Sequence, residues 1–186
     1  MNERTETMLK IFTTQLMGTF NKIQEQEEMM IEDISRVFTQ VLSAGGTLYF
    51  HGVDEMQAVS YEAVYGAQTL PATDFLIKGG KMAELIPQDG VVLATRFSED
   101  QKAADLAKEA REKGAVVIGI SATRKEEERL FVNEVDFHLD TKQVDALVPG
   151  EDGNRVGFPS AMAALYCYFA LFLTTTEILQ EHELDL

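Results

Sequence analysis

Residues 90–121, GVVLATRFSEDQKAADLAKEAREKGAVVIGIS, decide the fold. They open with one apolar run, Val91–Thr95, and close with a second, Ala115–Ile120. Between these runs, alanine and leucine recur at three- and four-residue spacing, and Gly114 stands where a left-handed helix end belongs. This order predicts a strand, a helix and a further parallel strand.

Three more apolar runs extend this rhythm on both sides: Thr47–His51, Asp74–Ile77 and Val135–Leu139. We expect helices between most of the five runs, at residues 54–68, between residues 81 and 87, at residues 103–112 and around residues 125–133. The pattern predicts an α/β fold with three layers and a five-stranded parallel sheet. Such sheets bind ligands outside the carboxyl ends of their strands, so the chemistry is expected in the loops that follow them.

The ends of the chain are helical in pattern. Apolar residues recur at helical spacing through residues 3–43, interrupted by the polar stretch Gln24–Glu28. We expect one domain, residues 1–186, with a helical extension at 1–44 and a wound core at 45–186. Ser160–Leu179 is apolar enough to be a buried helix, and the long connection at residues 141–158 is typical of functional or mobile loops. The apolar stripe of the extension either covers the sheet or contacts a second copy in a homodimer or homotetramer.

Composition excludes several classes of function. The 186 residues include 31 acidic and 16 basic ones, a formal charge of −15, which opposes binding to nucleic acid and to anionic membranes. A single cysteine, Cys167, favours a reducing cytoplasm. The apolar run Ala161–Leu173 is shorter than the ~20 residues that span a bilayer, and residues 2–4 lack a signal-peptide pattern. We expect no cofactor and no metal site, because dinucleotide and phosphate-loop motifs are missing and the three histidines lack ligand spacing.

Three strand-to-helix junctions match a capping box, in which a short polar residue caps a helix and Gln or Glu three residues later reaches back: Asp54 with Gln57, Ser98 with Gln101, and Thr123 with Glu126. In the simplest interpretation these residues cap helices and contribute about 1 kcal/mol each. A sharper interpretation makes the helix starts anion sites, but acidic residues already occupy the first two.

Basic residues gather in the loops after the strands, and Arg96 and Arg124 are the best candidates for binding an anion or a polyol. Each follows a strand directly and lies beside a hydroxyl residue. The alternative is that they neutralise adjacent acids such as Glu99 and Glu126.

The order of elements resembles the sugar-isomerase (SIS) domain superfamily, and within it the phosphoheptose-isomerase-like proteins. Residues 90–121 carry most of the resemblance, which spans nearly the whole chain. It implies an amino-terminal helical hairpin, a flavodoxin-like sheet in the order 2-1-3-4-5, and a sugar phosphate at the ends of strands one, three and four. The phosphate contacts that the resemblance implies are Thr95, Ser98, Ser121 and Thr123. From the same loops, Gly52, Asp54, Arg96 and Arg124 are further candidate ligand-binding residues.

Two turns differ from those of the superfamily. Residues 51–56 read HGVDEM where a Gly-x-Gly-x-Ser turn is usual, and residues 95–100 read TRFSED where Ser-x-Ser-Gly is usual. The resemblance also implies a catalytic glutamate on the helix after strand one and a histidine on the last helix. Glu62 and His182 lie in those segments, and His51 is a further candidate acid.

Three hypotheses follow. The first is a phosphosugar isomerase with Glu62 as base and His51 or His182 as acid. The second is a non-catalytic sensor of a sugar-derived metabolite that has lost the phosphate clasp. The third, a phosphoacceptor receiver domain, finds its acidic pair at residues 54–55 but has Thr95 where an aspartate is required.

Overall fold

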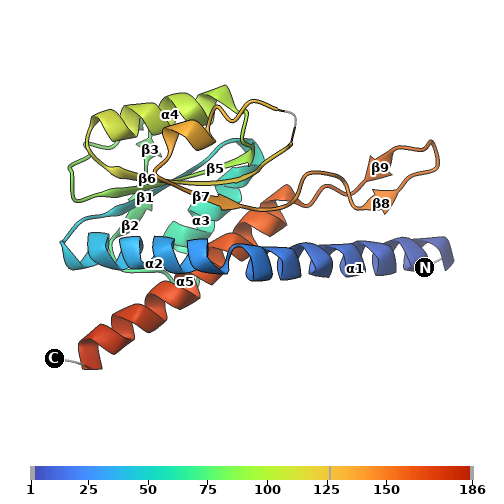
Figure 1. Ribbon diagram of the computed structural model, residues 1–186, viewed down its shortest axis with the longest axis horizontal. Helices are drawn as coiled ribbons and strands as arrows, with labels where there is room; N and C mark the ends of the chain where they lie inside the picture. Colours follow the sequence, from blue (N-terminus) through green and yellow to red (C-terminus); the bar gives the residue numbers. More distant parts are fainter. Residues whose placement is uncertain (1–2, 126, 185–186) are drawn as a thin grey trace.

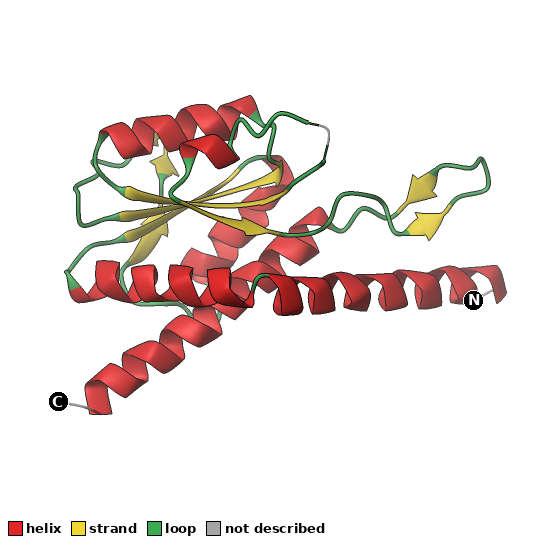
Figure 2. Ribbon diagram, in the orientation of Figure 1, coloured by secondary structure: helices red, strands yellow, loops and turns green. Residues whose placement is uncertain are grey.

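A five-stranded parallel sheet forms the centre of the computed structural model, which describes residues 3–125 and 127–184 (Figures 1 and 2). The order β2-β1-β5-β6-β7 is, counted along the chain, 2-1-3-4-5, and every neighbouring pair is parallel. The predicted fold class is confirmed. The strands are β1 (Leu48–Gly52), β2 (Thr73–Phe75), β5 (Gly90–Phe97), β6 (Val116–Ala122) and β7 (Phe137–Asp140).

Helices cover both faces of the sheet. In Figure 1, α4 (Gln101–Glu112) lies over one face, while α2 (Glu28–Ser43), α3 (Gln57–Tyr65) and α5 (Ser160–Leu184) lie over the other. Side chains alternate along β5, so Val91 and Leu93 pack with the alanines of α4 whereas Val92 and Ala94 pack with α2 and α5. Burial on both faces explains why the central strands read as continuous apolar runs.

The amino-terminal helices follow one another end to end. Both expected helices are present, α1 (Glu3–Gln26) and α2, but the chain does not fold back into the expected hairpin (Figure 1). The break falls at Glu27, within the polar stretch, and the four-residue hydrogen-bond spacing continues through it, from Glu27 N to Ile23 O and from Ile31 N to Glu27 O. The bend is therefore slight, and the first part of α1 extends beyond the sheet.

A short antiparallel pair accompanies this extension. β8 (Val148–Pro149) and β9 (Arg155–Val156) lie within the long connection and project on the same side as the start of α1 (Figure 2). Leu147 and Val148 pack with Leu16 of α1 in a small apolar cluster of their own. We refer to α1 up to Phe20, together with β8 and β9, as the arm.

Two expected helices are wrong. Between β2 and β5 the chain forms a hairpin, β3 (Ile77–Lys78) and β4 (Lys81–Met82), whose turn has Gly79 and Gly80 at positive φ. The described part of residues 125–133 forms turns that lead into the 3-10 helix η2 (Val132–Glu134), because this charged segment offers little apolar surface to bury.

Helix α5 is longer than its predicted apolar core. Residues 160–181 have a mean hydropathy of 1.5, long and apolar enough to cross a membrane, and they are the one such segment in the described chain. Of the most apolar window, 39% is buried inside the protein. Cys167, Tyr168 and Leu171 pack on the sheet, and burial raises the pKa of the Cys167 thiol.

Candidate functional site

A pocket of about 250 Å³ opens at the carboxyl ends of β1, β5 and β6. The strands are parallel, so their following loops meet at this edge and bring together residues about 40 positions apart. We name it the strand-exit pocket. It contains four of the predicted ligand-binding residues, and its lining is Val53, Asp54, Glu55, Thr95, Arg96, Phe97, Glu99, Asp100 and Arg124.

Arg96 is held by a carboxylate from the neighbouring loop. Its Nε donates to Glu55 Oε1 at 2.6 Å and its Nη2 to Glu55 Oε2 at 2.7 Å, a two-pronged pair. Ser160 Oγ, in the first turn of α5, also donates to Glu55 Oε1 at 2.8 Å. The Arg96 guanidinium, aided by Ser160, lowers the pKa of Glu55 to about 2 against a smaller opposing effect of burial.

Arg124 is held in the same manner on the other side of the pocket. It pairs with Glu99, and its guanidinium carbon lies 4.2 Å from the centroid of the Phe97 ring, a cation–π contact. Both arginines therefore pair with a nearby acid. For Arg124 and Glu99 this is the alternative given in the sequence analysis. Glu126, the other acid named there, lies outside the described residues. Within the described part of the chain, buried Glu99 Oε2 and Arg124 Nε lack a hydrogen-bond partner.

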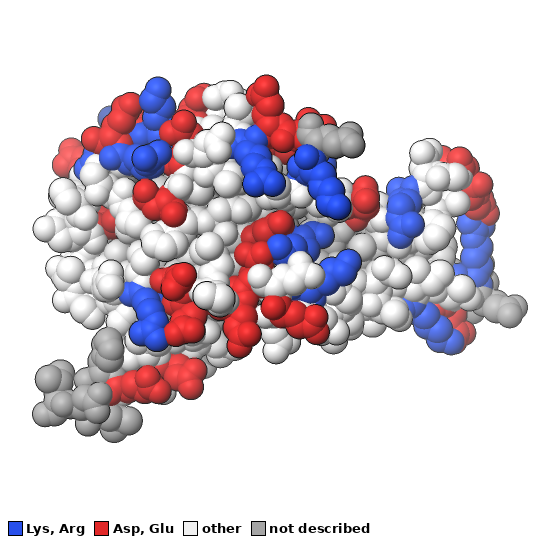
Figure 3. Space-filling view, viewed as in Figure 1, with Lys and Arg blue, Asp and Glu red and all other residues white. Residues whose placement is uncertain are grey.

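Charges alternate over the wider surface as well. On the face shown in Figure 3, Lys and Arg side chains lie next to Asp and Glu side chains. The arginines of the strand-exit pocket follow that pattern, so an anionic ligand there must compete with carboxylates.

The capping boxes are wrong at two junctions. Helix α4 is capped by Asp100, whose Oδ1 accepts from Ala103 N at 3.0 Å and whose Oδ2 accepts from Thr95 Oγ1 at 2.9 Å. Ser98 is buried, and its hydroxyl lacks a partner among the described residues. Asp54 has φ +52° and begins the 3-10 helix η1 (Asp54–Met56), without a side-chain cap for α3. At the third junction the described residues form no helix.

Three other predicted residues lie in packed surroundings rather than in the pocket lining. Ser121 Oγ lies 2.7 Å from His138 Nε2 and is fully buried. The amide of Thr123 contacts Asp140 Oδ1 at 3.4 Å. Gly52 packs against the backbone of η1, where a Cβ would lie 2.0 Å from Met56 O, so close approach explains this glycine.

The candidate catalytic residues lie on three different elements, β1, α3 and α5. His51, with its pKa lowered by burial, lines a separate hollow of about 300 Å³ between the end of β1 and α3, which we name the strand-edge pocket. Glu62 lies on α3, and its charge adds to burial in raising the pKa of Tyr168, on α5, to about 12. His182 is 22 positions beyond Ser160 on α5, about 33 Å along the helix axis.

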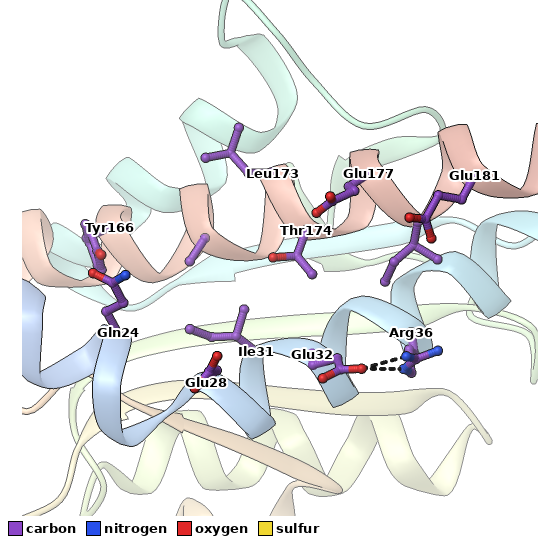
Figure 4. A pocket seen from close by; sticks show the side chains of 12 residues that line it. Gln24, Glu28, Ile31, Glu32, Arg36, Tyr166, Leu173, Thr174, Glu177 and Glu181 are labelled. Carbon is purple, nitrogen blue, oxygen red and sulfur yellow. Dashed lines mark hydrogen bonds and ion pairs between the residues drawn. The ribbon is translucent and has the colours of Figure 1, made fainter.

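A hollow of about 600 Å³ lies between α2 and α5, away from the strand ends (Figure 4). Its rim is acidic, with Glu28, Glu32, Glu177 and Glu181, and Arg36 is paired with Glu32 at 2.6 Å. None of the predicted site residues whose side chains the structure describes lines it. Within residues 3–125 and 127–184, no three His, Cys, Asp or Glu side chains gather closely enough to hold a metal ion.

Comparison with known proteins gives a family and a relative. A model of the family described as Domain of unknown function (DUF2529) matches residues 8–179. The Bacillus subtilis (strain 168) protein named Uncharacterized protein YwjG is 41% identical over 175 residues, which cover 94% of this chain and 99% of that protein.

Solved structures show the same fold at low sequence identity. A protein of Listeria monocytogenes, whose name gives sugar-phosphate isomerase as an assumed activity, has a TM-score of 0.65 at 14% identity over 97% of this chain and 93% of its own. A protein of E. coli CFT073, solved in complex with a ligand, has a TM-score of 0.60 at 14% identity over 95% of this chain and 93% of its own. These structures share the flavodoxin-like fold that the sequence predicts.

Proposed function

The chain belongs to the DUF2529 family, and from that membership, its fold and its strand-exit pocket we propose that it binds a sugar phosphate or a related sugar-derived metabolite without converting it. The ligand lies against Arg96 and Arg124 at the carboxyl ends of β1, β5 and β6. The proposal joins the ligand class of the first sequence-based hypothesis to the non-catalytic role of the second. The sugar-phosphate name of the Listeria protein and the ligand bound by the E. coli protein support this class of ligand through the shared fold.

One observation carries the proposal: two arginines from neighbouring strands face one small pocket, each held by a glutamate. Glu55 keeps the Arg96 guanidinium in a geometry that a phosphate oxygen pair also matches, because Arg binds carboxylate and phosphate in the same two-pronged way. The partnerless Glu99 Oε2 is an acceptor for a sugar hydroxyl, and Arg124 Nε is a donor. The ligand thus satisfies groups that are buried and incompletely paired in the described chain.

The placing of the candidate acid and base outside the strand-exit pocket supports binding without conversion. Isomerisation requires a base and an acid within hydrogen-bond reach of adjacent carbons of one substrate. His51 lines the strand-edge pocket and Glu62 lies on α3, whereas the arginines line the strand-exit pocket. We therefore propose that the chain shares with the phosphoheptose isomerases the class of ligand but not the reaction.

Isothermal titration with five- to seven-carbon sugar phosphates, their parent sugars and inorganic phosphate tests this function. We expect binding of sugar phosphates that Arg96→Gln abolishes and that Glu55→Gln strengthens, since the variant removes a competing charge from Arg96. Arg36→Gln, which breaks a similar pair on α2, is the control and leaves binding unchanged.

Analysis of each sugar phosphate after incubation provides the second arm. Recovery of the unchanged compound supports a binder, and the appearance of its isomer would replace this proposal with the isomerase hypothesis. Lack of binding across the panel, or binding indifferent to Arg96→Gln, would overturn it.

We propose further that the chain pairs with a second copy of itself and resides in the cytoplasm. Met162, Phe169 and Leu173 of α5 are 45%, 40% and 64% exposed and stand seven and four positions apart, so they form one apolar stripe. A lone buried cysteine, Cys167, suits a reducing compartment.

A further inference from the structure

The strand-edge pocket shares no lining residue with the strand-exit pocket. β2 ends at Phe75, which pairs with Phe50, so the last two residues of β1 extend beyond it. The space beside His51 is instead bounded by α3 and by the chain that leaves β2. The result is a hollow of about 300 Å³, at the lower end of the range for small-molecule sites.

One wall of this pocket is aromatic and open to solvent. Tyr61 and Tyr65 of α3 are 55% and 73% exposed, although large aromatic side chains are usually mostly buried. Both rings lean on Phe75 of β2, with centroids 5.3 Å apart and planes tilted by 66° and 59°. Because the rings support one another edge to face, they are held in place while tyrosine faces stay available for stacking.

The floor of the pocket is polar and incompletely paired. Ser60 is only 3% exposed, and its hydroxyl has no hydrogen-bond partner among the residues described. A buried hydroxyl without a partner is costly, so a ligand that bonds to it gains free energy. His51 lies in the same pocket, and its lowered pKa keeps the ring neutral near pH 7, with one donor and one acceptor nitrogen.

The charge of the rim limits the ligand further. Lys78 is paired with Asp74 at 2.7 Å, so the rim is close to neutral, and the whole chain carries a formal charge of −15. A polyphosphate or a nucleic acid is therefore disfavoured. A purely apolar ligand would leave Ser60 unpaired.

We propose that the strand-edge pocket is a second binding site, for an uncharged aromatic heterocycle of the nucleobase type. The ring stacks on Tyr61 or Tyr65, and its polar edge pairs with Ser60 and His51. Stacking on an aromatic side chain does not depend on which base is bound, because every base has a π-face. The site does not include Arg96 or Arg124, so it can be tested separately from sugar-phosphate binding.

Isothermal titration of the full chain with adenosine and cytidine tests this site, with glucose as a saturated-ring control. We expect the nucleosides to bind and glucose not to bind. Tyr65→Leu is expected to weaken adenosine binding about tenfold, because it removes an exposed stacking face with little effect on folding. Ser60→Ala is expected to weaken it about fivefold by removing one hydrogen bond to the ligand.

Phe169→Leu, which removes an exposed ring from α5, is the matched control and leaves adenosine binding unchanged. Chemical shifts of the tyrosine ring protons, followed by NMR, provide a readout that a change in stability alone would not move. The proposal is overturned if neither nucleoside binds, if glucose binds in their place, or if Tyr65→Leu and Ser60→Ala bind adenosine like the parent chain. Sugar-phosphate binding persists in both variants and reports separately on the strand-exit pocket.

Discussion

Glu55 joins three parts of the chain through one carboxylate. It accepts from Arg96 at the end of β5 and from Ser160 at the start of α5, while its own backbone belongs to the loop after β1. The loop, the strand and the last helix are thus tied together at the mouth of the strand-exit pocket. A ligand that takes Arg96 from Glu55 therefore also alters the contact to α5.

The Glu55 pair predicts a pH-dependent contribution to stability. Since the pKa of Glu55 falls from 4.5 to about 2 on folding, its contribution is present above pH 4.5 and is lost as the pH falls toward 2. Both side chains are about a third exposed or more, so we expect Glu55→Gln to lower the free energy of unfolding by about 1 kcal/mol at pH 7. Urea denaturation at pH 7, 5 and 3 measures it, and a difference that grows on acidification would contradict the assignment.

His138 predicts a second window at higher pH. Burial lowers its pKa from 6.5 to about 4, with Asp140 opposing and Lys142 and Arg129 assisting that shift. The unfolded chain binds more protons between these values, so stability is full above pH 6.5 and falls as the pH drops toward 4, by about 3 kcal/mol at most.

His138→Gln tests that window because it removes the titration and keeps a hydrogen-bonding group near Ser121. We expect the variant to lose less stability than the parent chain between pH 6.5 and 4. His51 is retained in both proteins and contributes equally to both. Parallel stability curves over this range would refute the role given to His138.

At the scale of elements, the start of α4 depends on Asp100 rather than on Ser98. Asp100→Ala removes both the cap on Ala103 N and the partner of Thr95, and is expected to cost about 1–2 kcal/mol. Ser98→Ala is the matched comparison: it removes a hydroxyl without a described partner, and we expect a change close to zero. Thermal unfolding of the two variants gives the ranking, and a larger loss in Ser98→Ala would reverse our assignment.

The same junction shows what sequence patterns can and cannot settle. Ser98 and Asp100 both lie just before the apolar stripe of α4, and both can cap a helix. Asp100 is the cap because β5 continues to Phe97, two residues beyond its predicted end, so α4 starts later than predicted. Its neighbour β6 likewise continues to Ala122. Strands of long apolar character were predictable, whereas their last residues depend on pairing with neighbours.

Other differences between prediction and structure also have identifiable reasons. Gly79-Gly80 is a sequence signal for a two-residue hairpin turn, which argues against the helix expected between residues 81 and 87. In the candidate site, Arg96 and Arg124 were predictable from their places after strands. Ser160, 105 positions from Glu55, was not, because only the fold brings α5 to that loop.

At the scale of the whole molecule, the apolar stripe on α5 predicts self-association. We expect Leu173→Glu to reduce the mass measured by size-exclusion chromatography with light scattering to that of one chain, since a charge cannot be buried there without cost. Ile86→Glu changes a residue that is 50% exposed in the loop before β5 and is expected to leave the mass unchanged. A parent chain that is already monomeric would contradict the proposed pairing.

The arm also bears on how the chain is made. Its small apolar cluster joins Leu16 to Leu147 and Val148, which are synthesised more than 130 residues later. On the ribosome, the first helix emerges long before the residues that cover it, because chains leave from the amino terminus onward. The arm therefore forms late during synthesis. A chain arrested before residue 147 lacks the residues that cover Leu16, and this apolar side chain is then open to chaperones.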